Sequence, residues 1–380
     1  MSMLLPGQAH RPEIGRSGRG TGAAAEGPAA DLRLRRWRSL RAAVAGLAWL
    51  VFGPAFAGPP ESSRARLPAP GLVDTADLAA WLPRMNSASR DRNYQGTLVF
   101  STAGVLSSMR VAHFCVGDNH YERSETLDGK MRRVYRHNDL VHTVWPQRGL
   151  VVVEPHGAPR QLPSTLQAVE PFALEQYALR LEGPDRVAGR PAQVLLLQPR
   201  DEWRLAQRLW ADEATGLMLR ADILSETGAV LESMAFSDLE VGIKAQPELV
   251  LQALRQIDGM KVLRPRAVLA QLETQGWQLS RPLPGFKVAH CVRRWHEVPP
   301  GADAPATGNE VLQTVFGDGL THITLFIEAF DSQRHRQGLG LRFGATHTLA
   351  ERKGDYWITA MGDVPPSTLR RLVDALERRR

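Results

Sequence analysis

The histidines are the side chains of this sequence whose type and placement point most directly to chemistry. His113, His120, His137 and His142 fall on neighbouring predicted strands, and imidazole is the commonest metal ligand in proteins. Unliganded histidine is nevertheless common on the open face of a sheet, and we find no aspartate or cysteine at the fixed offsets typical of metal-binding motifs. The sequence therefore predicts no metal site.

The chain also lacks the recognised catalytic motifs. It contains no GxSxG, no HExxH, no phosphate loop and no GxGxxG after a strand. Gly338, Gly340 and Gly344 are wrongly spaced for nucleotide binding and indicate a hairpin turn. Glu351 and Asp355 stand four apart across a predicted turn, where a solvated loop is the simpler interpretation. We expect a binding protein without a cofactor rather than an enzyme.

Two cysteines, Cys115 and Cys291, stand 176 positions apart, so a disulfide forms only if distant parts of the chain touch. One cysteine falls in each of the two domains predicted below, and such a bond would fix the relative orientation of the domains. A disulfide and two free thiols both remain open, and we favour the thiols.

An Arg-rich apolar stretch near the N-terminus predicts export. Residues 33–57 have a basic start, an uncharged apolar segment from Ala42 to Phe52, and the triplet ending at Ala57, which together indicate a signal peptide cleaved after Ala57. A membrane anchor is the alternative, but Gly53-Pro54 interrupts the run before about 20 apolar residues are reached. Residues 1–32 indicate an over-extended start or a disordered leader.

The basic charge belongs mostly to this leader. The whole chain has 47 Lys+Arg and 40 Asp+Glu, and residues 1–57 hold eight of the former and three of the latter. The 323 residues that follow therefore carry 39 basic and 37 acidic residues, a net charge of +2. This balance gives no argument for nucleic acid, and the length is sufficient for two domains.

The pattern of the mature chain predicts an α+β protein. Leu78, Trp81, Leu82, Met85 and Ala88 recur at helical spacing, and short β-type runs follow from Tyr94. Asp128-Gly129 and Asp318-Gly319 predict hairpins, residues 163–179 a second helix, and residues near 367–376 a C-terminal helix. We place a larger domain at 74–245, a linker at 246–270 and a smaller domain at 271–380.

Apolar residues on alternate positions of the strands suggest a lipid cavity. Alternation places eight of them on one concave side of a curved sheet. An ordinary core under a helix is the other explanation, which the sequence alone does not exclude. The eight are Leu98, Phe100, Met109, Val111, Val134, Val144, Leu195 and Leu197.

Several stretches of the chain, from about Met85 to Leu376, resemble the MucB/RseB family of periplasmic regulators of the envelope-stress sigma factor. The specific parts are "LWADEATGLMLR" from Leu209 to Arg220, "LPGFKV" before a basic pair, and "VFGDGLTHITLFIE" from Val315 to Glu328. Members usually have Tyr-Ser where this sequence has Phe316-Gly317. The hairpin of Asp318, Gly319 and Leu320 supplies our candidates for partner binding.

The resemblance implies a fold and a function. The larger domain should be a LolA-like half-barrel of antiparallel strands with helices on its concave face, and the smaller domain should pack a helix on an antiparallel sheet. Family members bind the periplasmic domain of an RseA/MucA-like anti-sigma factor and shield it from proteolysis. Lipopolysaccharide or lipoprotein acyl chains release them. The resemblance implies neither a cofactor nor nucleic acid, and it leaves homo-oligomerisation open. A lipoprotein or lipid carrier and an exported hydrolase are the alternatives, and the second domain counts against the carrier.

Overall fold

The computed structural model describes residues 80–155, 169–295, 310–335 and 339–379. The predicted leader and signal peptide lie outside these ranges, as do residues 163–168 of the second predicted helix. Within the described part of the chain, no helix is long and apolar enough to cross a membrane.

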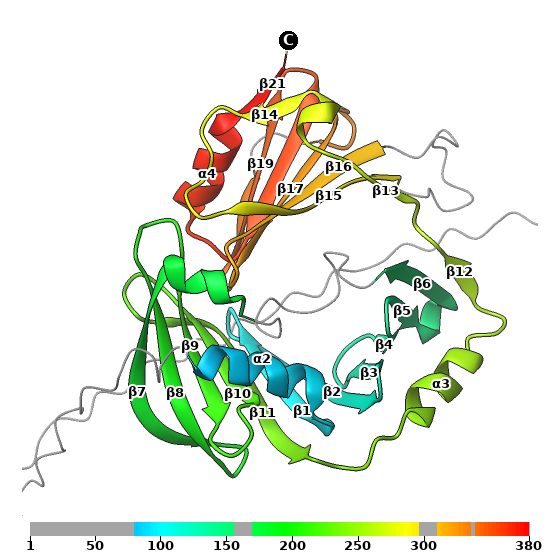
Figure 1. Ribbon diagram of the computed structural model, residues 1–380. Coiled ribbons are helices and arrows are strands. Elements are labelled where there is room, and N and C mark those ends of the chain that lie inside the picture. Colours follow the sequence, from blue (N-terminus) through cyan, green and yellow to red (C-terminus); the bar gives the residue numbers. More distant parts are fainter. Residues whose placement is uncertain (1–79, 156–168, 296–309, 336–338, 380) are drawn as a thin grey trace, which may run out of the picture. The chain divides into compact units, whose positions relative to one another are not determined.

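A twelve-stranded sheet forms the larger domain, in the order β12-β6-β5-β4-β3-β2-β1-β11-β10-β9-β8-β7 (Figure 1). Every neighbouring pair is antiparallel except β12 with β6. The strands are β1 (Tyr94–Thr102), β2 (Val105–Val116), β3 (Asn119–Thr126), β4 (Arg133–His137), β5 (Leu140–Trp145), β6 (Leu150–Pro155), β7 (Tyr177–Val187), β8 (Arg190–Pro199), β9 (Ala206–Asp212), β10 (Met218–Leu224), β11 (Val230–Val241) and β12 (Lys261–Leu263).

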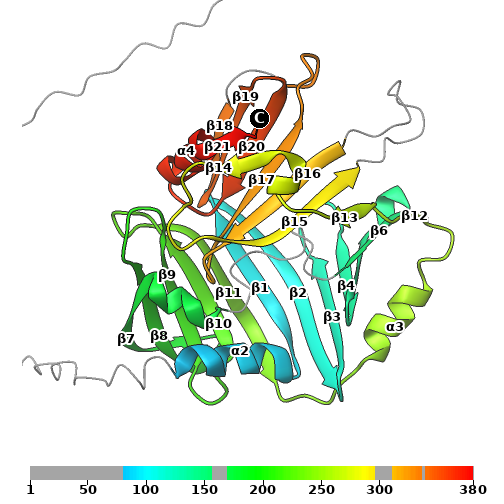
Figure 2. The same cartoon turned by 45° about the horizontal axis from the view of Figure 1, so that its top comes forward.

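One face of this sheet is covered by α2 (Trp81–Asp91) and the 3-10 helix η3 (Pro171–Glu175), and the sheet curves around α2 (Figures 1 and 2). Leu82, Met85 and Ala88 form the buried stripe of α2, as their spacing predicts. Pro83 lies in the first turn, where its missing N–H is not needed, so the helix begins later than Asp77. We call this the α2 face of the sheet.

The second predicted helix is wrong at its C-terminal end. The 3-10 helix ends at Glu175, and β7 begins at Tyr177. The alternation of Leu179 and Leu181, which both pack against the core of the α2 face, is the strand signal that the helical prediction overlooked.

The predicted linker contains regular structure. Helix α3 (Glu248–Arg255) places Val250 in a cluster on the opposite face of the larger sheet, and β12 joins the edge of that sheet. The next strand, β13 (Ala267–Leu269), joins the smaller sheet instead. The chain therefore passes from one sheet to the other between Leu263 and Ala267.

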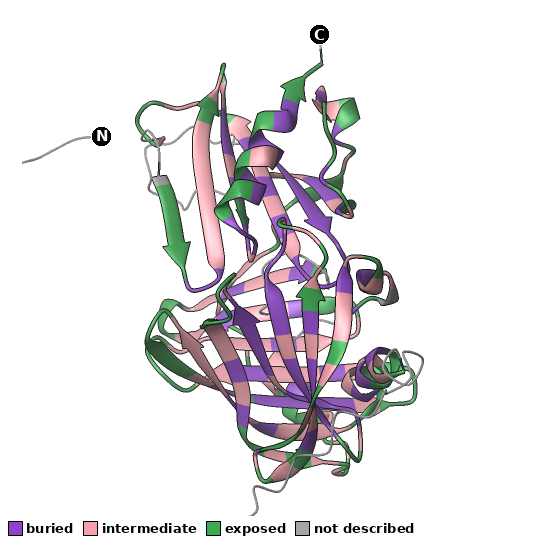
Figure 3. Ribbon diagram, turned by 90° about the vertical axis from the view of Figure 1, so that its left-hand side faces the viewer, coloured by how far each residue is buried: buried purple, intermediate pink, exposed green. Residues whose placement is uncertain are grey.

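The smaller domain is a seven-stranded sheet in the order β13-β15-β16-β17-β20-β19-β18, covered by α4 (Pro366–Ala375). Leu369, Leu372, Val373 and Leu376 are buried against it, as the apolar stripe predicts. Buried and more exposed residues alternate along many strands of both sheets (Figure 3). The other elements are β14 (Trp277–Leu279), β15 (Lys287–Trp295), β16 (Glu310–Gly317), β17 (His322–Ala329), β18 (Leu339–Phe343), β19 (Thr346–Lys353), β20 (Tyr356–Gly362), β21 (Leu376–Arg378), η1 (Pro146–Arg148) and η4 (Glu273–Gln275).

The two predicted hairpins have different outcomes. The turn at Asp318-Gly319 joins β16 directly to β17. At Asp128-Gly129 a two-residue turn is wrong, because six residues separate β3 from β4. Asp128 instead accepts hydrogen bonds from the backbone N–H of Ser108 at 2.5 Å and from its hydroxyl at 2.6 Å. The carboxylate thus ties the loop to β2, which a short turn would not allow.

Candidate functional site

The residues predicted to line a lipid cavity lie mostly on the α2 face. Leu98, Met109, Val111, Leu195 and Leu197 are buried in one cluster with Leu82 and Met85 of α2, and Phe100 packs against that cluster while partly exposed. Val134 shares the face, since it pairs with Ser124, which pairs with Val111. In this structure the apolar surface is filled by the protein's own helices.

Val144 does not belong with the others. Val134 pairs with Thr143, so these two side chains lie on the same face. Val144 follows Thr143 in the strand and therefore points to the opposite face. There it lies in the cluster with Phe114, Tyr135 and Val250. The prediction that Val144 lies on the α2 face is wrong. Both valines are apolar, but the register of the β4–β5 hairpin places them on opposite faces of the sheet.

The β16–β17 turn of the smaller domain completes the cluster on the α2 face. Leu320 is buried in it beside Ala173 of η3, and the backbone N–H of Glu170 donates to the carbonyl of Gly319 at 2.7 Å. The three partner-binding candidates, Asp318, Gly319 and Leu320, therefore lie where the two domains meet. Direct contact between Leu320 and a partner would require this junction to open.

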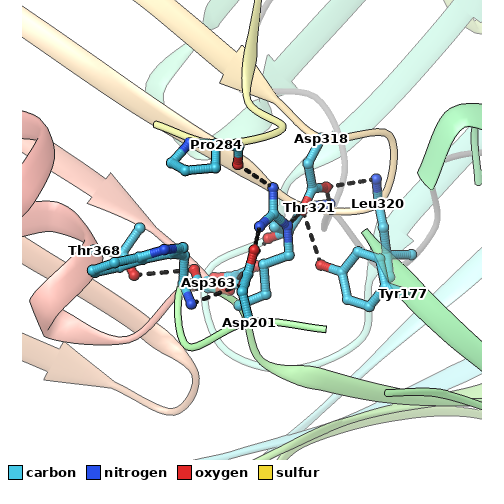
Figure 4. Close-up of polar contacts among 10 residues, drawn as sticks. Tyr177, Asp201, Pro284, Asp318, Leu320, Thr321, Asp363 and Thr368 are labelled. Carbon is cyan, nitrogen blue, oxygen red and sulfur yellow. Dashed lines mark hydrogen bonds and ion pairs between the residues drawn. The ribbon is translucent and has the colours of Figure 1, made fainter. Parts of the chain in front are cut away.

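A buried ion pair holds the junction (Figure 4). Arg204, between β8 and β9, donates from Nε to Oδ2 of Asp318 at 2.6 Å, and both side chains are 0% exposed. The hydroxyl of Tyr177 donates to the same oxygen at 3.0 Å. Oδ1 accepts the backbone N–H groups of Leu320 at 2.9 Å and Thr321 at 2.8 Å. The Asp318 carboxylate thus accepts the backbone N–H groups of its own turn with one oxygen and binds two side chains of the larger domain with the other.

The guanidinium of Arg204 also has several partners besides Asp318. Arg204 donates to the carbonyl of Pro284 at 2.7 Å and pairs with Asp201, and its guanidinium lies 4.5 Å from the centre of the Phe286 ring. Burial, followed by the charge of Asp318, raises the pKa of Tyr177 well above its usual value, so its hydroxyl stays protonated and donates. Because no member of this network is left unpaired, it specifies one arrangement of the junction.

A second polar contact between the domains involves Glu232 of β11. Its Oε1 accepts the backbone N–H of Ala345 at 3.1 Å, in the turn between β18 and β19. Burial first, and then the charge of Asp363, raises the pKa of Glu232 to about 7. Gly344 has a φ of +61°, and a Cβ there would lie 2.4 Å from Oε1, so this close approach requires glycine.

An exposed apolar surface lies beside this second contact. β18 is an edge strand, and Leu341 and Phe343 are each 58% exposed on it. Leu341 pairs with Thr348, which pairs with Met361, so these side chains form a row on one face of the smaller sheet. A hollow of about 370 Å³ adjoins it, lined by Ser101, Ala103, Gly104, Val230, Leu231, Arg342 and Gly344. We call Leu341, Phe343, Met361 and this hollow the β18 surface.

Two of the four histidines singled out from the sequence meet in space. His113 and His120 come together with Cys115. The spacing of these three residues matches no known metal-binding motif, so the sequence did not predict the grouping. The ring of His137 stacks on that of Tyr121 with centroids 4.7 Å apart. Burial lowers the pKa of His142. Both cysteines are free thiols.

No local pattern in the sequence singles out Tyr177, Arg204 or Glu232. Arg204 and Asp318 are separated by 114 positions, so no local spacing links them. The fold and its contacts define a two-domain protein, in which a curved sheet with an apolar face is joined to a smaller sheet through a buried polar junction.

Comparison with known proteins identifies the family. The MucB/RseB N-terminal domain matches residues 77–254, and the MucB/RseB C-terminal domain matches residues 271–377. The chain belongs to the MucB/RseB family. It is 31% identical over 308 residues to the sigma factor AlgU regulatory protein MucB of Pseudomonas aeruginosa, a match covering 79% of this chain and 90% of that protein.

Further similarity agrees with this assignment. The sigma-E factor regulatory protein RseB of Haemophilus influenzae is 25% identical over 300 residues, covering 78% of this chain and 90% of RseB. A solved MucA/MucB complex of Pseudomonas aeruginosa contains a chain that is 26% identical, with a TM-score of 0.60, covering 80% of this chain and 99% of that one. These relatives are regulatory proteins by name, and one is solved with its partner.

Proposed function

We propose that this protein binds the periplasmic segment of a MucA/RseA-like anti-sigma factor, protects it from regulated proteolysis, and releases it when an acyl-chain ligand binds. The observation that carries the proposal is the family match over both domains, together with the solved MucA/MucB complex of a relative that aligns with 80% of this chain. The predicted signal peptide supports a periplasmic location, where such a segment is accessible.

The β18 surface is the best candidate for the partner site. An edge strand offers unpaired backbone N–H and C=O groups that an extended peptide can use, and apolar side chains beside the edge give the contact area. Leu341 and Phe343 provide such side chains, and the hollow beside Arg342 can accept one from the peptide. The five residues of β18 offer a longer edge than the three of β13 on the other side of the same sheet.

The α2 face is the best candidate for the lipid. Its cluster is apolar and continuous, but it is already filled by α2, η3 and Leu320. An acyl chain can enter only by displacing one of these, and displacing Leu320 or η3 disturbs the junction at Asp318. A ligand shifts an equilibrium only by its differential affinity for the two states, and coupling of about 1–3 kcal/mol would weaken partner binding roughly 5- to 150-fold.

The test is a cleavage assay. The anti-sigma segment is incubated with the protease that makes the first cut, with and without this protein, and with and without lipopolysaccharide fragments. We expect slow cleavage with the protein alone and fast cleavage when lipopolysaccharide is added. Equal rates with and without the protein would refute the regulatory proposal. Lipopolysaccharide binding without any effect on cleavage would favour the lipid carrier instead.

Matched variants locate the partner site in the same assay. Phe343→Lys changes an exposed apolar side chain on the β18 edge and should abolish most of the protection. Leu269→Lys makes the same kind of change on β13, where the side chain is 80% exposed, and should protect as the wild type does. The opposite result would move the partner site to the β13 edge.

A further inference from the structure

Three soft and borderline metal ligands converge at the edge of α2. Nε2 of His113 lies 3.2 Å from Sγ of Cys115, and that sulfur lies 3.4 Å from Nδ1 of His120. The three ligand atoms all lie within 4.8 Å of one another. His113 and Cys115 stand two apart on β2, on the same side of that strand, and His120 pairs with Cys115 across the β2–β3 hairpin.

These distances fit a tetrahedral ion. Zinc binds sulfur at about 2.3 Å and imidazole nitrogen at about 2.0–2.1 Å, so adjacent N and S ligands in a tetrahedron stand about 3.6 Å apart. The two N to S separations in the structure are 3.2 and 3.4 Å, so only a few tenths of an ångström of adjustment is required.

The surroundings have the features of a supported metal site. Glu122 Oε1 lies 3.3 Å from Nδ1 of His113, which leaves Nε2 to face the cluster, in the carboxylate–histidine arrangement that orients metal ligands. The carbonyl of Arg90 lies 2.9 Å from Nε2 and 2.7 Å from Sγ. It belongs to the last turn of α2, where the helix dipole favours a cation.

The backbone around the cluster is also fixed by side chains. The N–H of Cys115 donates to Asn93 Oδ1 at 2.8 Å, and the N–H of His120 donates to Asn138 Oδ1 at 2.9 Å. Tyr94 stacks on the ring of His113 with centroids 5.3 Å apart. His113 is buried, whereas Cys115 and His120 are partly exposed, so the ligands are held in place and an ion can still enter.

We propose that His113 Nε2, Cys115 Sγ and His120 Nδ1 bind one Zn²⁺ ion, with the Arg90 carbonyl or a water molecule completing the tetrahedron. The Cys115 thiol gives its proton to solvent as the sulfur–zinc bond forms, so the thiolate and two neutral imidazoles hold the ion. The ion would tie the C-terminal end of α2 to the β2–β3 hairpin and would hold α2 on its face of the sheet.

Metal titration of the full chain without a histidine tag tests this site. Competition with a chromophoric zinc chelator should give one tightly bound Zn²⁺ per chain, and Co²⁺ substitution should show a thiolate-to-metal charge-transfer band. Loss of an outer-shell partner costs about 10- to 100-fold in affinity. We therefore expect that loss for Glu122→Gln, and at least about 100-fold for Cys115→Ser and for His120→Ala.

Cys291→Ser is the matched control. Cys291 is buried in the smaller domain, with its sulfur 3.2 Å from the hydroxyl of Thr314, and its replacement should change neither the affinity nor the cobalt band. The proposal is overturned if the wild type binds zinc no more tightly than Cys115→Ser does. A cobalt spectrum without the thiolate band would overturn it as well. Near-ultraviolet circular dichroism of the metal-free variants establishes that they fold, so that a lost affinity reports the ligand.

Discussion

The buried pair at the domain junction gives the sharpest quantitative test. Asp318→Asn keeps the size of the side chain and removes its charge. The amide oxygen can still accept the N–H groups of Leu320 and Thr321, which the wild-type Oδ1 accepts at 2.9 and 2.8 Å. What is lost is the anion that faces Arg204 at 2.6 Å and accepts the hydroxyl of Tyr177 at 3.0 Å. The variant therefore keeps the hydrogen bonds within the turn and removes both the charge and the acceptor that the larger domain uses.

The expected cost follows from burial. Both charged side chains are 0% exposed, and removing one partner of a buried pair typically costs about 3–5 kcal/mol because the other charge is left without compensation. Arg204 keeps Asp201 and the carbonyl of Pro284, so we expect the lower end, about 3 kcal/mol. Tyr177→Phe removes one hydrogen bond to a charged group and should cost about 1.5–3 kcal/mol.

Urea denaturation followed by tryptophan fluorescence measures these costs. With a slope of about 3 kcal/mol per molar urea, a loss of 3 kcal/mol lowers the midpoint by about 1 M. The double variant should cost less than the sum of the two, because both changes act on the same oxygen. Asp258→Asn, at an exposed position in the loop after α3, is the control and should leave the midpoint unchanged. A midpoint for Asp318→Asn equal to that of Asp258→Asn would refute the argument that this pair holds the junction.

Four further predictions concern separate parts of the chain. The pKa of Glu232 is raised from 4.5 to about 7 on folding, so its contribution to stability is present below pH 4.5 and is lost as the pH rises through 7. Since Glu232 is partly exposed, we expect Glu232→Gln to be only about 1 kcal/mol more stable than the wild type at pH 8 in urea denaturation, and equal stabilities would contradict this. Phe100→Asn, at the partly exposed margin of the α2 face, should leave protection of the anti-sigma segment intact while raising the lipopolysaccharide concentration needed for release, and an unchanged dose response would exclude Phe100 from the lipid site. A thiol reagent should find two reactive groups, Cys115 and Cys291, in denatured and unreduced protein, whereas none would indicate a disulfide. The intact mass of the exported protein should correspond to cleavage after Ala57, and a retained leader would indicate a membrane anchor.

Much of the fold was accessible from local patterns. Alternating strands, the Asp318-Gly319 turn and the stripe of Leu369, Leu372 and Val373 each depend on residues a few positions apart, and the structure has all of them. The same local logic failed at residues 176–179, where a helical pattern and a strand pattern overlap and pairing with β8 decides the outcome. It failed again at Val144, because the face of a strand depends on its register with its neighbours.

The candidate site was much less accessible, because its parts come from distant positions. The apolar residues of the α2 face were identified from alternation, but their burial under Leu320 required knowledge of how the domains meet. The pairing of Arg204 with Asp318 spans 114 positions, and neither residue is exceptional in its own segment. The meeting of His120 with Cys115 likewise depends on the register of the β2–β3 hairpin.

The energetics of the junction bear on how the proposed switch would work. Complete loss of the Arg204–Asp318 pair is expected to cost about 3 kcal/mol or more, whereas release of the partner requires coupling of only about 1–3 kcal/mol. A lipid therefore needs only to weaken the pair, not to abolish it. Displacing Leu320 from the cluster is enough, because Asp318 binds the N–H groups of Leu320 and Thr321 and moves with that turn. The same turn joins β16 to β17, and β17 pairs with β20, which carries Met361 of the β18 surface. An acyl chain on the α2 face that shifts this turn would therefore also shift the paired strands β17 and β20, and with them the surface where we place the partner.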